Sequence, residues 1–236
     1  MIPLISRSSL SPSSIYCVGK NYPDHEREMA SMESGGKEPS AVPALREPII
    51  FMKPGSALAC DGITSIPLFG GIPISSSMHY EVELVLLVGC DTDGVCMDNA
   101  ASVIAGYGVG LDMTLRDVQL NAKKAGNPWL KSKGFRRSAL VSDFVPSTSI
   151  INREKLSISL RLNGRLVQHS PVSEMTFSPE YLVYYLSYVY GLKRDDLIFT
   201  GTPAGVGPTK ASDRLDASLE SGDPSTVLAT LEAIVN

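Results

Sequence analysis

The sequence predicts an α+β protein whose core is rich in short β-strands and whose helices are few. Three observations support this class. Short apolar runs recur along the chain, an Asn-Gly pair separates two strand-like segments, and only three or four stretches have a helical pattern. The 236 residues are enough to build one large core, so we expect 1–236 to form a single domain.

The first quarter of the chain is predicted to form two strands, with a lid between them in the sequence. Ile15 to Val18 and Ile49 to Met52 are strand-like, and Asp24 to Met29 is a short polar helix candidate. Residues 30–47 are rich in Gly, Ser, Pro and Glu. A long loop within a compact domain is more often a lid or a linker than filler, so we expect a mobile lid over about 22–47.

Later segments carry clearer signals. Thr114-Leu115-Arg116-Asp117 predicts a helix start, with the helix running to about Ala125 before Gly126 and Pro128. Strands at 156–162 and 165–169 flank Asn163-Gly164, the strongest short hairpin signal. A second helix opens at Ser178-Pro179 and ends at Gly191.

Composition narrows the functional classes. A formal net charge of −4, without a long basic block, argues against a nucleic-acid groove. No apolar run approaches the roughly 20 residues that span a bilayer, which argues against a membrane role. The four cysteines form no CxxC pair and indicate free thiols in a reducing compartment. The first 23 residues are Ser-rich and lack acidic groups, so cytosol and mitochondrion both remain open.

The stretch HYEVELVLLVG, residues 79–89, places two glutamates at the head of an apolar strand. Side chains alternate along a strand, so His79, Glu81 and Glu83 share one face. The two carboxylates then lie roughly 6–7 Å apart at Cβ, a separation that one divalent cation can bridge. The alternative is a strand end with two solvated glutamates.

A third acid favours the cation. In AGYGVGLDMT, Gly106, Gly108 and Gly110 precede Asp112 on one strand face, where another backbone or a ligand can approach closely. Asp112 is otherwise an acidic partner of the helix that starts near Thr114. Three carboxylates on rigid strands suit Mg²⁺ or Mn²⁺, and the lack of cysteines nearby disfavours zinc.

Two further segments offer catalytic side chains. His25 and Glu28 are three residues apart in NYPDHEREM, which suits a general base oriented by a carboxylate, although such pairs are usually surface features. PWLKSKGF offers Lys131 and Lys133, between which spacing alone does not choose.

The Gly-rich turn FTGTPAGVG, residues 199–207, lacks the lysine of a phosphate loop. It can still present backbone N–H groups and the Thr202 hydroxyl to a carboxylate. His169 ends a hairpin strand and is interpreted as a surface histidine.

Taken in order, these segments resemble the fumarylacetoacetate hydrolase superfamily. The resemblance covers about residues 15–215 and is closest to the compact acylpyruvase/oxaloacetate decarboxylase-type branch. The combination is far more specific than any single piece; its motifs are NYPDHEREM, EPIIFMKPGSAL, HYEVELVLLVG, GYGVGLDMTLRDVQ, PWLKSKGF, LRLNGRLVQ and FTGTPAGVGP.

The resemblance implies a mixed β-sandwich roll and a homodimer. It assigns Glu81, Glu83 and Asp112 as ligands of Mg²⁺ or Mn²⁺, and His25 with Glu28 as a catalytic dyad on a lid that orders when substrate binds. The residues that it assigns to substrate are Arg116, Gln119, Lys133 and Thr202, with Lys133 also catalytic. His79 is then expected to lie behind the ligands rather than to bind the metal.

The implied activity is metal-dependent C–C bond cleavage of short α-keto acids. It comprises hydrolysis of acylpyruvates to pyruvate and a carboxylic acid, and decarboxylation of oxaloacetate through the same metal-bound enolate. One alternative keeps the site but makes the protein an isomerase or decarboxylase of 2-hydroxy-2,4-dienedioates. A remoter alternative is a non-catalytic metal-binding protein.

Overall fold

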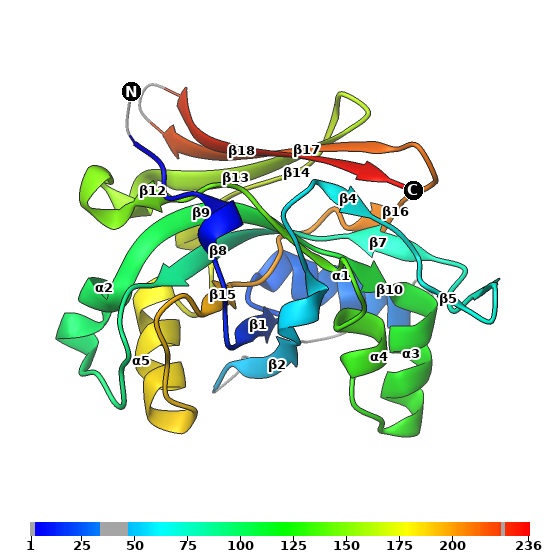
Figure 1. The fold of residues 1–236 in the computed structure, drawn as a ribbon, viewed down its shortest axis with the longest axis horizontal. Coiled ribbons are helices and arrows are strands. Elements are labelled where there is room, and N and C mark those ends of the chain that lie inside the picture. Colours follow the sequence, from blue (N-terminus) through cyan, green and yellow to red (C-terminus); the bar gives the residue numbers. More distant parts are fainter. Residues whose placement is uncertain (1–2, 34–46, 223–224) are drawn as a thin grey trace.

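The protein is a sheet-rich α+β structure with few helices, as the sequence predicts. The computed structural model describes residues 3–33, 47–222 and 225–236. Two large sheets lie one above the other, and helices cover the outer side of the lower sheet (Figure 1). None of the helices in the described ranges is long and apolar enough to cross a membrane.

The lower sheet is mixed and has the order β2-β1-β15-β8-β9-β11-β3, with β12 paired to β9. The pairs β1–β15 and β11–β3 are parallel, and the other pairs are antiparallel. Its strands are β1 (Ile15–Gly19), β2 (Ile49–Lys53), β3 (Leu58–Ala59), β8 (Val82–Val88), β9 (Ile104–Asp112), β11 (Ala139–Val141), β12 (Val145–Pro146) and β15 (Leu197–Phe199).

The upper sheet has the order β14-β13-β17-β18-β4 and contains the predicted hairpin. Asn163 and Gly164 both have positive φ, 50° and 83°, as a two-residue hairpin turn requires. The strands are β4 (Ile63–Thr64), β13 (Leu156–Leu162), β14 (Arg165–Pro171), β17 (Arg214–Gly222) and β18 (Ser225–Val235). Two small sheets comprise β7 (Met78–Tyr80), β10 (Thr114–Leu115) and β16 (Gly207–Pro208), and β5 (Leu68–Phe69) with β6 (Ile72–Pro73).

Strand β8 is buried on both faces, as its apolar run predicts. Leu84 and Leu86 face the large core between the two sheets. Val85 and Leu87 face a smaller core on the opposite side. This central strand is therefore a rigid mount for the residues at its amino-terminal end.

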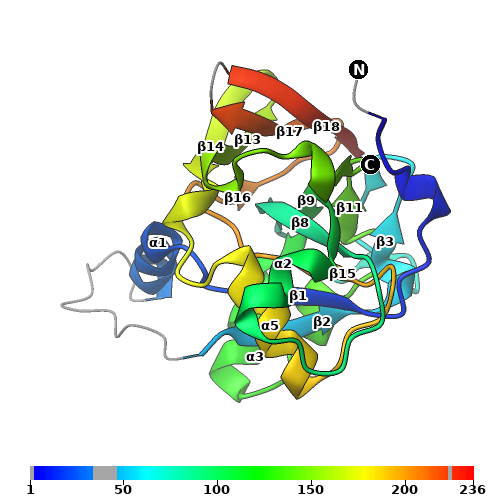
Figure 2. The ribbon, with the colours of Figure 1, turned by 90° about the vertical axis from the view of Figure 1, so that its left-hand side faces the viewer.

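The helices are α1 (Pro23–Glu33), α2 (Ala100–Val103), α3 (Arg116–Ala125), α4 (Leu130–Lys133) and α5 (Pro179–Val189). Figure 2 shows α1, α2, α3 and α5 from the side. Short 3₁₀ turns are η1 (Arg7–Ser9), η2 (Gly55–Ala57), η3 (Met97–Asn99), η4 (Ser147–Ser149), η5 (Arg153–Lys155) and η6 (Val172–Glu174). The hydroxyl of Ser178 caps α5 by accepting from Tyr181 N–H, and Gly126 ends α3 with a φ of 68°.

Two predicted boundaries were wrong. Thr114 does not open a helix, because it pairs with His79 in β10, and α3 begins at Arg116. Helix α1 continues four residues past the predicted end at Met29, so the amino-terminal part of the expected loop is helical. The rest of that loop, residues 34–46, lies outside the described residues.

Candidate active site and metal centre

Three buried carboxylates meet at one end of the central strands. One oxygen from each of Glu81, Glu83 and Asp112 lies within 4.8 Å of the others. The register of β8 and β9 explains the meeting, since Glu83 pairs with Gly110 and Asp112 N–H donates to Glu81 O at 2.9 Å. The sheet brings together three acids that lie up to 31 positions apart in the sequence.

The local geometry around Glu81 differs from the single strand that we expected. Glu81 lies at a break between β7 and β8, so His79 belongs to the small sheet. His79 Nε2 lies 3.1 Å from Ser77 Oγ. Burial, together with the positive charge of Arg116, lowers the pKa of His79 to about 4. His79 is therefore a neutral side chain at neutral pH, and its expected place behind the ligands stays a prediction.

The glycines of β9 make room for protein atoms. A Cβ on Gly110 would lie 2.6 Å from Val85 Cγ2 and 2.8 Å from Phe199 Cε1. A Cβ on Gly108 would lie 3.0 Å from the Phe144 ring. Of the two expectations for this face, close approach of other chain segments therefore accounts for these glycines.

Cationic side chains surround the acids. Lys133 Nζ donates to Glu81 Oε2 at 2.6 Å and to Asp112 Oδ2 at 2.7 Å, whereas Lys131 is exposed. Arg116 donates to the other oxygen of Glu81 and, at 2.6 Å, to Gln119 Oε1. Sequence spacing could not choose between the two lysines, and the fold turns Lys133 inward.

Lys53 is a site residue that the sequence analysis missed. Its Nζ lies 2.7 Å from Asp112 Oδ1 and donates to Ser138 Oγ at 3.0 Å. The side chain is fully buried at the end of β2. A lysine that ends an apolar strand immediately before Pro54 was the available signal, because a buried lysine requires an anionic partner.

The neighbouring charges affect the pKa values of Glu81 and Glu83 differently. Burial alone would raise the pKa of Glu81, but Lys133 and Arg116 hold it below its usual range. Burial and the neighbouring Asp112 raise the pKa of Glu83 well above its usual range. Within the described ranges Glu83 forms no ion pair, and it accepts a hydrogen bond from Gly201 N–H at 2.7 Å.

This donor set fits a hard divalent cation. Glu81, Glu83 and Asp112 offer only oxygen, they are buried, and their oxygens are close enough to share one ion. Glu83 is the carboxylate whose negative charge is least compensated, so added positive charge stabilises it. The three residues would hold Mg²⁺ or Mn²⁺, with further positions left for water or a ligand.

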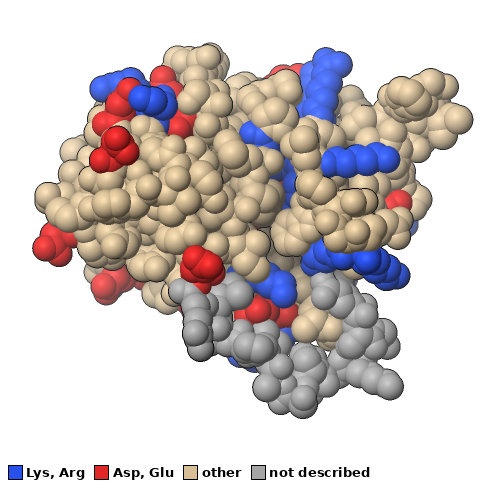
Figure 3. Space-filling view, turned by 90° about the horizontal axis from the view of Figure 1, so that it is seen from below, with Lys and Arg blue, Asp and Glu red and all other residues tan. Residues whose placement is uncertain are grey.

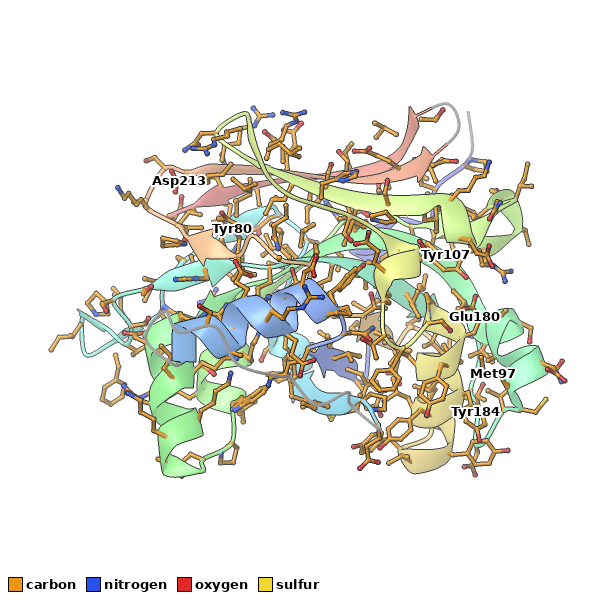
Figure 4. All side chains as sticks on the ribbon, turned by 180° about the vertical axis from the view of Figure 1, so that it is seen from behind. Tyr80, Met97, Tyr107, Glu180, Tyr184 and Asp213 are labelled. Carbon is orange, nitrogen blue, oxygen red and sulfur yellow. The ribbon has the colours of Figure 1, made fainter. Side chains whose placement is uncertain are left out.

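Helix α1 lies in the segment that the sequence predicts to be a lid, so it is called the lid helix, and it places its polar pair at this site. His25 Nδ1 lies 3.2 Å from Glu28 Oε2, and both oxygens of Glu28 accept from Gly205 N–H at 3.2 Å. The start of the lid is fixed by Asn21, which donates to Phe177 O at 3.0 Å and to Thr200 O at 2.8 Å. In the view from behind, α1 crosses the molecule below Tyr80 (Figure 4).

A cavity joins the lid to the carboxylates. Seven of its lining residues are ones that the sequence analysis chose: His25, Glu81, Glu83, Arg116, Gln119, Lys133 and Thr202. Glu28 and Asp112 lie behind this lining and contact His25 and Lys133 respectively. The arrangement can bind an anion between cationic side chains and can transfer a proton through His25.

The outer part of the cavity is basic and aromatic. Lys20 and Lys123 line it together with Phe51 and Trp129. Lys20 has a left-handed backbone with a φ of 59°, a conformation that costs energy for a non-glycine residue and is often found at functional sites. Lys123 Nζ lies 5.2 Å from the centre of the Trp129 ring. In the view from below, most basic side chains lie on the right-hand half of the face, with a smaller group at the upper left among acidic ones (Figure 3).

Comparison with known proteins gives consistent matches along the chain. The family model described as fumarylacetoacetate (FAA) hydrolase C-terminal matches residues 14–235. Oxaloacetate tautomerase FAHD1, mitochondrial, from Mus musculus is 40% identical over 207 residues, covering 87% of this chain and 86% of that protein. Oxaloacetate tautomerase YcgM from Escherichia coli is 40% identical over 210 residues, covering 88% and 89%.

A solved structure has the same fold. Fumarylpyruvate hydrolase from Pseudomonas aeruginosa, in complex with Mn²⁺ and pyruvate, aligns with a TM-score of 0.80 at 31% identity. The alignment covers 98% of this chain and 94% of that one.

Proposed function

The chain belongs to the fumarylacetoacetate hydrolase family, and on this premise we propose that it is an enzyme acting on small α-keto acids through their enolates. The observation that carries the proposal is the position of His25. It lines the same cavity as Glu81, Glu83 and Lys133, and Glu28 lies 3.2 Å from its ring nitrogen. A base held by a carboxylate beside a strongly charged pocket suits removal of a proton next to a carbonyl group.

The charge of the site supports an enolate. Three carboxylates and the three cations Lys53, Lys133 and Arg116 balance one another in the protein alone. A bound Mg²⁺ or Mn²⁺ would supply two positive charges and polarise a keto oxygen. The pocket would then match a ligand with two negative charges, which is the charge of a pyruvate-type enolate with its carboxylate.

Keto–enol tautomerisation of oxaloacetate is the reaction that we favour. The C3–H bond breaks, an O–H bond forms at the C2 oxygen, and no other atom changes place. His25 takes the proton from C3, Glu28 stabilises the imidazolium that results, and Lys133 offers an ammonium to the developing negative charge. The two relatives named oxaloacetate tautomerase support this choice, and isomerisation of 2-hydroxy-2,4-dienedioates would use the same proton transfer.

C–C bond cleavage is the second candidate, supported by the fumarylpyruvate hydrolase structure. In acylpyruvate hydrolysis, His25 takes a proton from water that attacks the C4 carbonyl. The C3–C4 bond then breaks, the acyl group leaves as a carboxylic acid, and the enolate becomes pyruvate on protonation at C3. In oxaloacetate decarboxylation the same bond breaks and CO₂ leaves, without a nucleophile.

A substrate panel tests these candidates. Enol loss from oxaloacetate is followed by ultraviolet absorbance, and pyruvate release is measured from oxaloacetate, acetylpyruvate and fumarylpyruvate, each with Mg²⁺, Mn²⁺ or EDTA. We expect metal-dependent acceleration of enol loss as the fastest reaction. Fast pyruvate release with no effect on the enol would favour cleavage instead. Metal-dependent binding of oxalate without any turnover would favour a binding protein.

The proposal also includes an oligomeric state and a cellular compartment. We expect a homodimer, supported by the β5–β6 hairpin, where Leu68, Phe69 and Ile72 are 64%, 84% and 71% exposed. Light scattering on the purified protein would contradict this by giving the monomer mass. A cytoplasmic or mitochondrial location is consistent with the mitochondrial relative, and fractionation of the source cells tests it.

A further inference from the structure

A buried amide connects the upper sheet to the active site. Gln168 lies on β14 in the upper sheet and is only 2% exposed, although the flanking Val167 and His169 are partly or fully exposed. Its side chain contacts Val82, which lies between the two glutamates Glu81 and Glu83, and it also contacts the loop after β15. A polar side chain buried this completely requires hydrogen-bond partners for its whole amide group.

The partners fix which end of the amide is which. Val82 N–H, which can only donate, lies 2.9 Å from Gln168 Oε1. Pro203 O, which can only accept, lies 2.8 Å from Nε2. If the amide were turned over, its NH₂ group would face the Val82 N–H and its oxygen would face the Pro203 carbonyl oxygen. Neither contact is a hydrogen bond, so only one orientation of the amide is possible.

This orientation sets the polarity of the Thr202 hydroxyl. The second N–H of Gln168 donates to Thr202 Oγ1 at 2.9 Å, because an amide nitrogen cannot accept. The hydroxyl therefore keeps its own hydrogen to donate. Among the residues that the structure describes, no acceptor for this hydrogen is found, and Thr202 is 2% exposed and lines the cavity.

We propose that Gln168 is a positioning residue that makes Thr202 a hydrogen-bond donor to an anionic oxygen of the ligand. The ligand class, an α-keto acid carboxylate or the corresponding enolate, rests on the proposed function. Gln168 does not touch the ligand. It acts by donating to one of the two lone pairs of Thr202 Oγ1, so the hydroxyl hydrogen cannot point toward Gln168 and is left for the ligand.

The test measures binding of oxalate, a mimic of the pyruvate enolate, to the Mn²⁺-loaded protein by calorimetry. Thr202→Val, which has nearly the same shape, should weaken oxalate binding roughly 10- to 150-fold, the range for a hydrogen bond to a charged group. Thr202→Ser should retain most of the affinity. Thr209→Val is the matched control, because the Thr209 hydroxyl donates to Met78 O and does not line the cavity; it should bind oxalate like the wild type.

The coupling between the two residues separates positioning from packing. Gln168→Glu replaces the donor to Thr202 by a carboxylate that accepts the hydroxyl hydrogen, so it should weaken oxalate binding by a similar factor. In the Thr202→Val background the same change should have little further effect. If the factors by which the two single changes weaken oxalate binding multiply in the double variant, the proposal is overturned. Calorimetry of Mn²⁺ alone shows that each variant retains its metal site.

Two outcomes distinguish this inference from the proposed function. If the wild-type protein with Mn²⁺ does not bind oxalate, the proposed function fails and the inference fails with it. If the wild type binds oxalate and Thr202→Val binds it equally well, the inference alone fails. This second result needs only the threonine variant, so it stands even if Gln168→Glu does not fold.

Discussion

The carboxylate floor and the lid helix form one cavity, but different forces hold them in place. The floor consists of Glu81, Glu83 and Asp112, which are buried at the break before β8, on β8 and on β9 respectively, and the register of these strands fixes their spacing. The lid helix α1 is polar, and His25 is held at the cavity by Glu28, which in turn accepts from Gly205 N–H. We therefore expect changes in the floor to alter metal binding and changes in the lid to alter turnover alone.

The largest expected effect comes from the floor. Glu83→Ala removes the carboxylate whose charge is least compensated and leaves two acids that are already paired with Lys133. Mn²⁺ binding measured by calorimetry should weaken by more than about 100-fold, beyond the loss typical of groups behind a ligand. Turnover of oxaloacetate should fall to background. Turnover that survives both this change and EDTA would contradict the metal centre.

His25→Ala tests the lid side of the comparison. Loss of a positioned base should lower kcat about 10²- to 10⁴-fold, because proton transfer then depends on water. Mn²⁺ affinity should stay within a factor of about two, since in the described structure His25 forms no hydrogen bond or ion pair with the floor carboxylates and has only an electrostatic interaction with Glu81. If cleavage occurs, acylpyruvate hydrolysis should suffer more than oxaloacetate decarboxylation, which needs no activated water. Equal losses in both would remove this distinction between the two cleavage reactions.

The same contrast explains what the sequence could predict. The floor acids could be chosen because a charged residue within an apolar strand is conspicuous, and strand alternation put two of them together. Alternation could not reveal the break at Glu81 or the pairing of Thr114 with His79, since both depend on the register of distant strands. Lys53 and Gln168 escaped notice because each looks like an ordinary polar residue at a strand end or on a hairpin, and their burial is a tertiary property.

Lys53→Met, at the cation that pairs with the floor residue Asp112, separates the effect on stability from the effect on metal affinity. Removing one partner of a buried ion pair should reduce the free energy of unfolding of the metal-free protein by about 3–5 kcal/mol, because Asp112 is left less compensated. The site then carries one positive charge fewer, so Mn²⁺ should raise the melting temperature of the variant more than that of the wild type. An equal shift in both proteins would show that Lys53 does not influence the metal site.

Glu28 variants separate two tasks within the lid. Glu28→Gln keeps an oxygen that can accept from Gly205 N–H but loses the charge beside His25. We expect kcat to fall about 10-fold, within the range for a charged hydrogen bond. In Glu28→Ala the contact with Gly205 is lost as well, so kcat should fall further. If the two variants are equally impaired, the Gly205 contact contributes nothing to turnover.

The smallest expected effect lies at the outer part of the cavity, called the rim, which is lined by Lys20, Phe51, Lys123 and Trp129. Lys123 lines the cavity outside the floor, so its ammonium can attract the second carboxylate of oxaloacetate. Lys123→Met keeps an apolar side chain against Trp129 and should raise the KM for oxaloacetate about 1.5- to 5-fold, the range for a partly exposed ion pair. The inhibition constant of pyruvate, which has one carboxylate, should change less.

The neighbouring lysine supplies the control for this last prediction. Lys124 is exposed and does not line the cavity, so Lys124→Met removes the same charge from the same helix without touching the ligand path. The difference between Lys123→Met and the wild type should shrink as salt is added, because a Debye length of about 8 Å at physiological ionic strength screens exposed charges. Equal effects of both lysine variants on KM would mean that the general charge of α3 attracts the substrate. An effect confined to Lys123→Met, and larger for oxaloacetate than for pyruvate, would place the recognition of a second carboxylate at the rim.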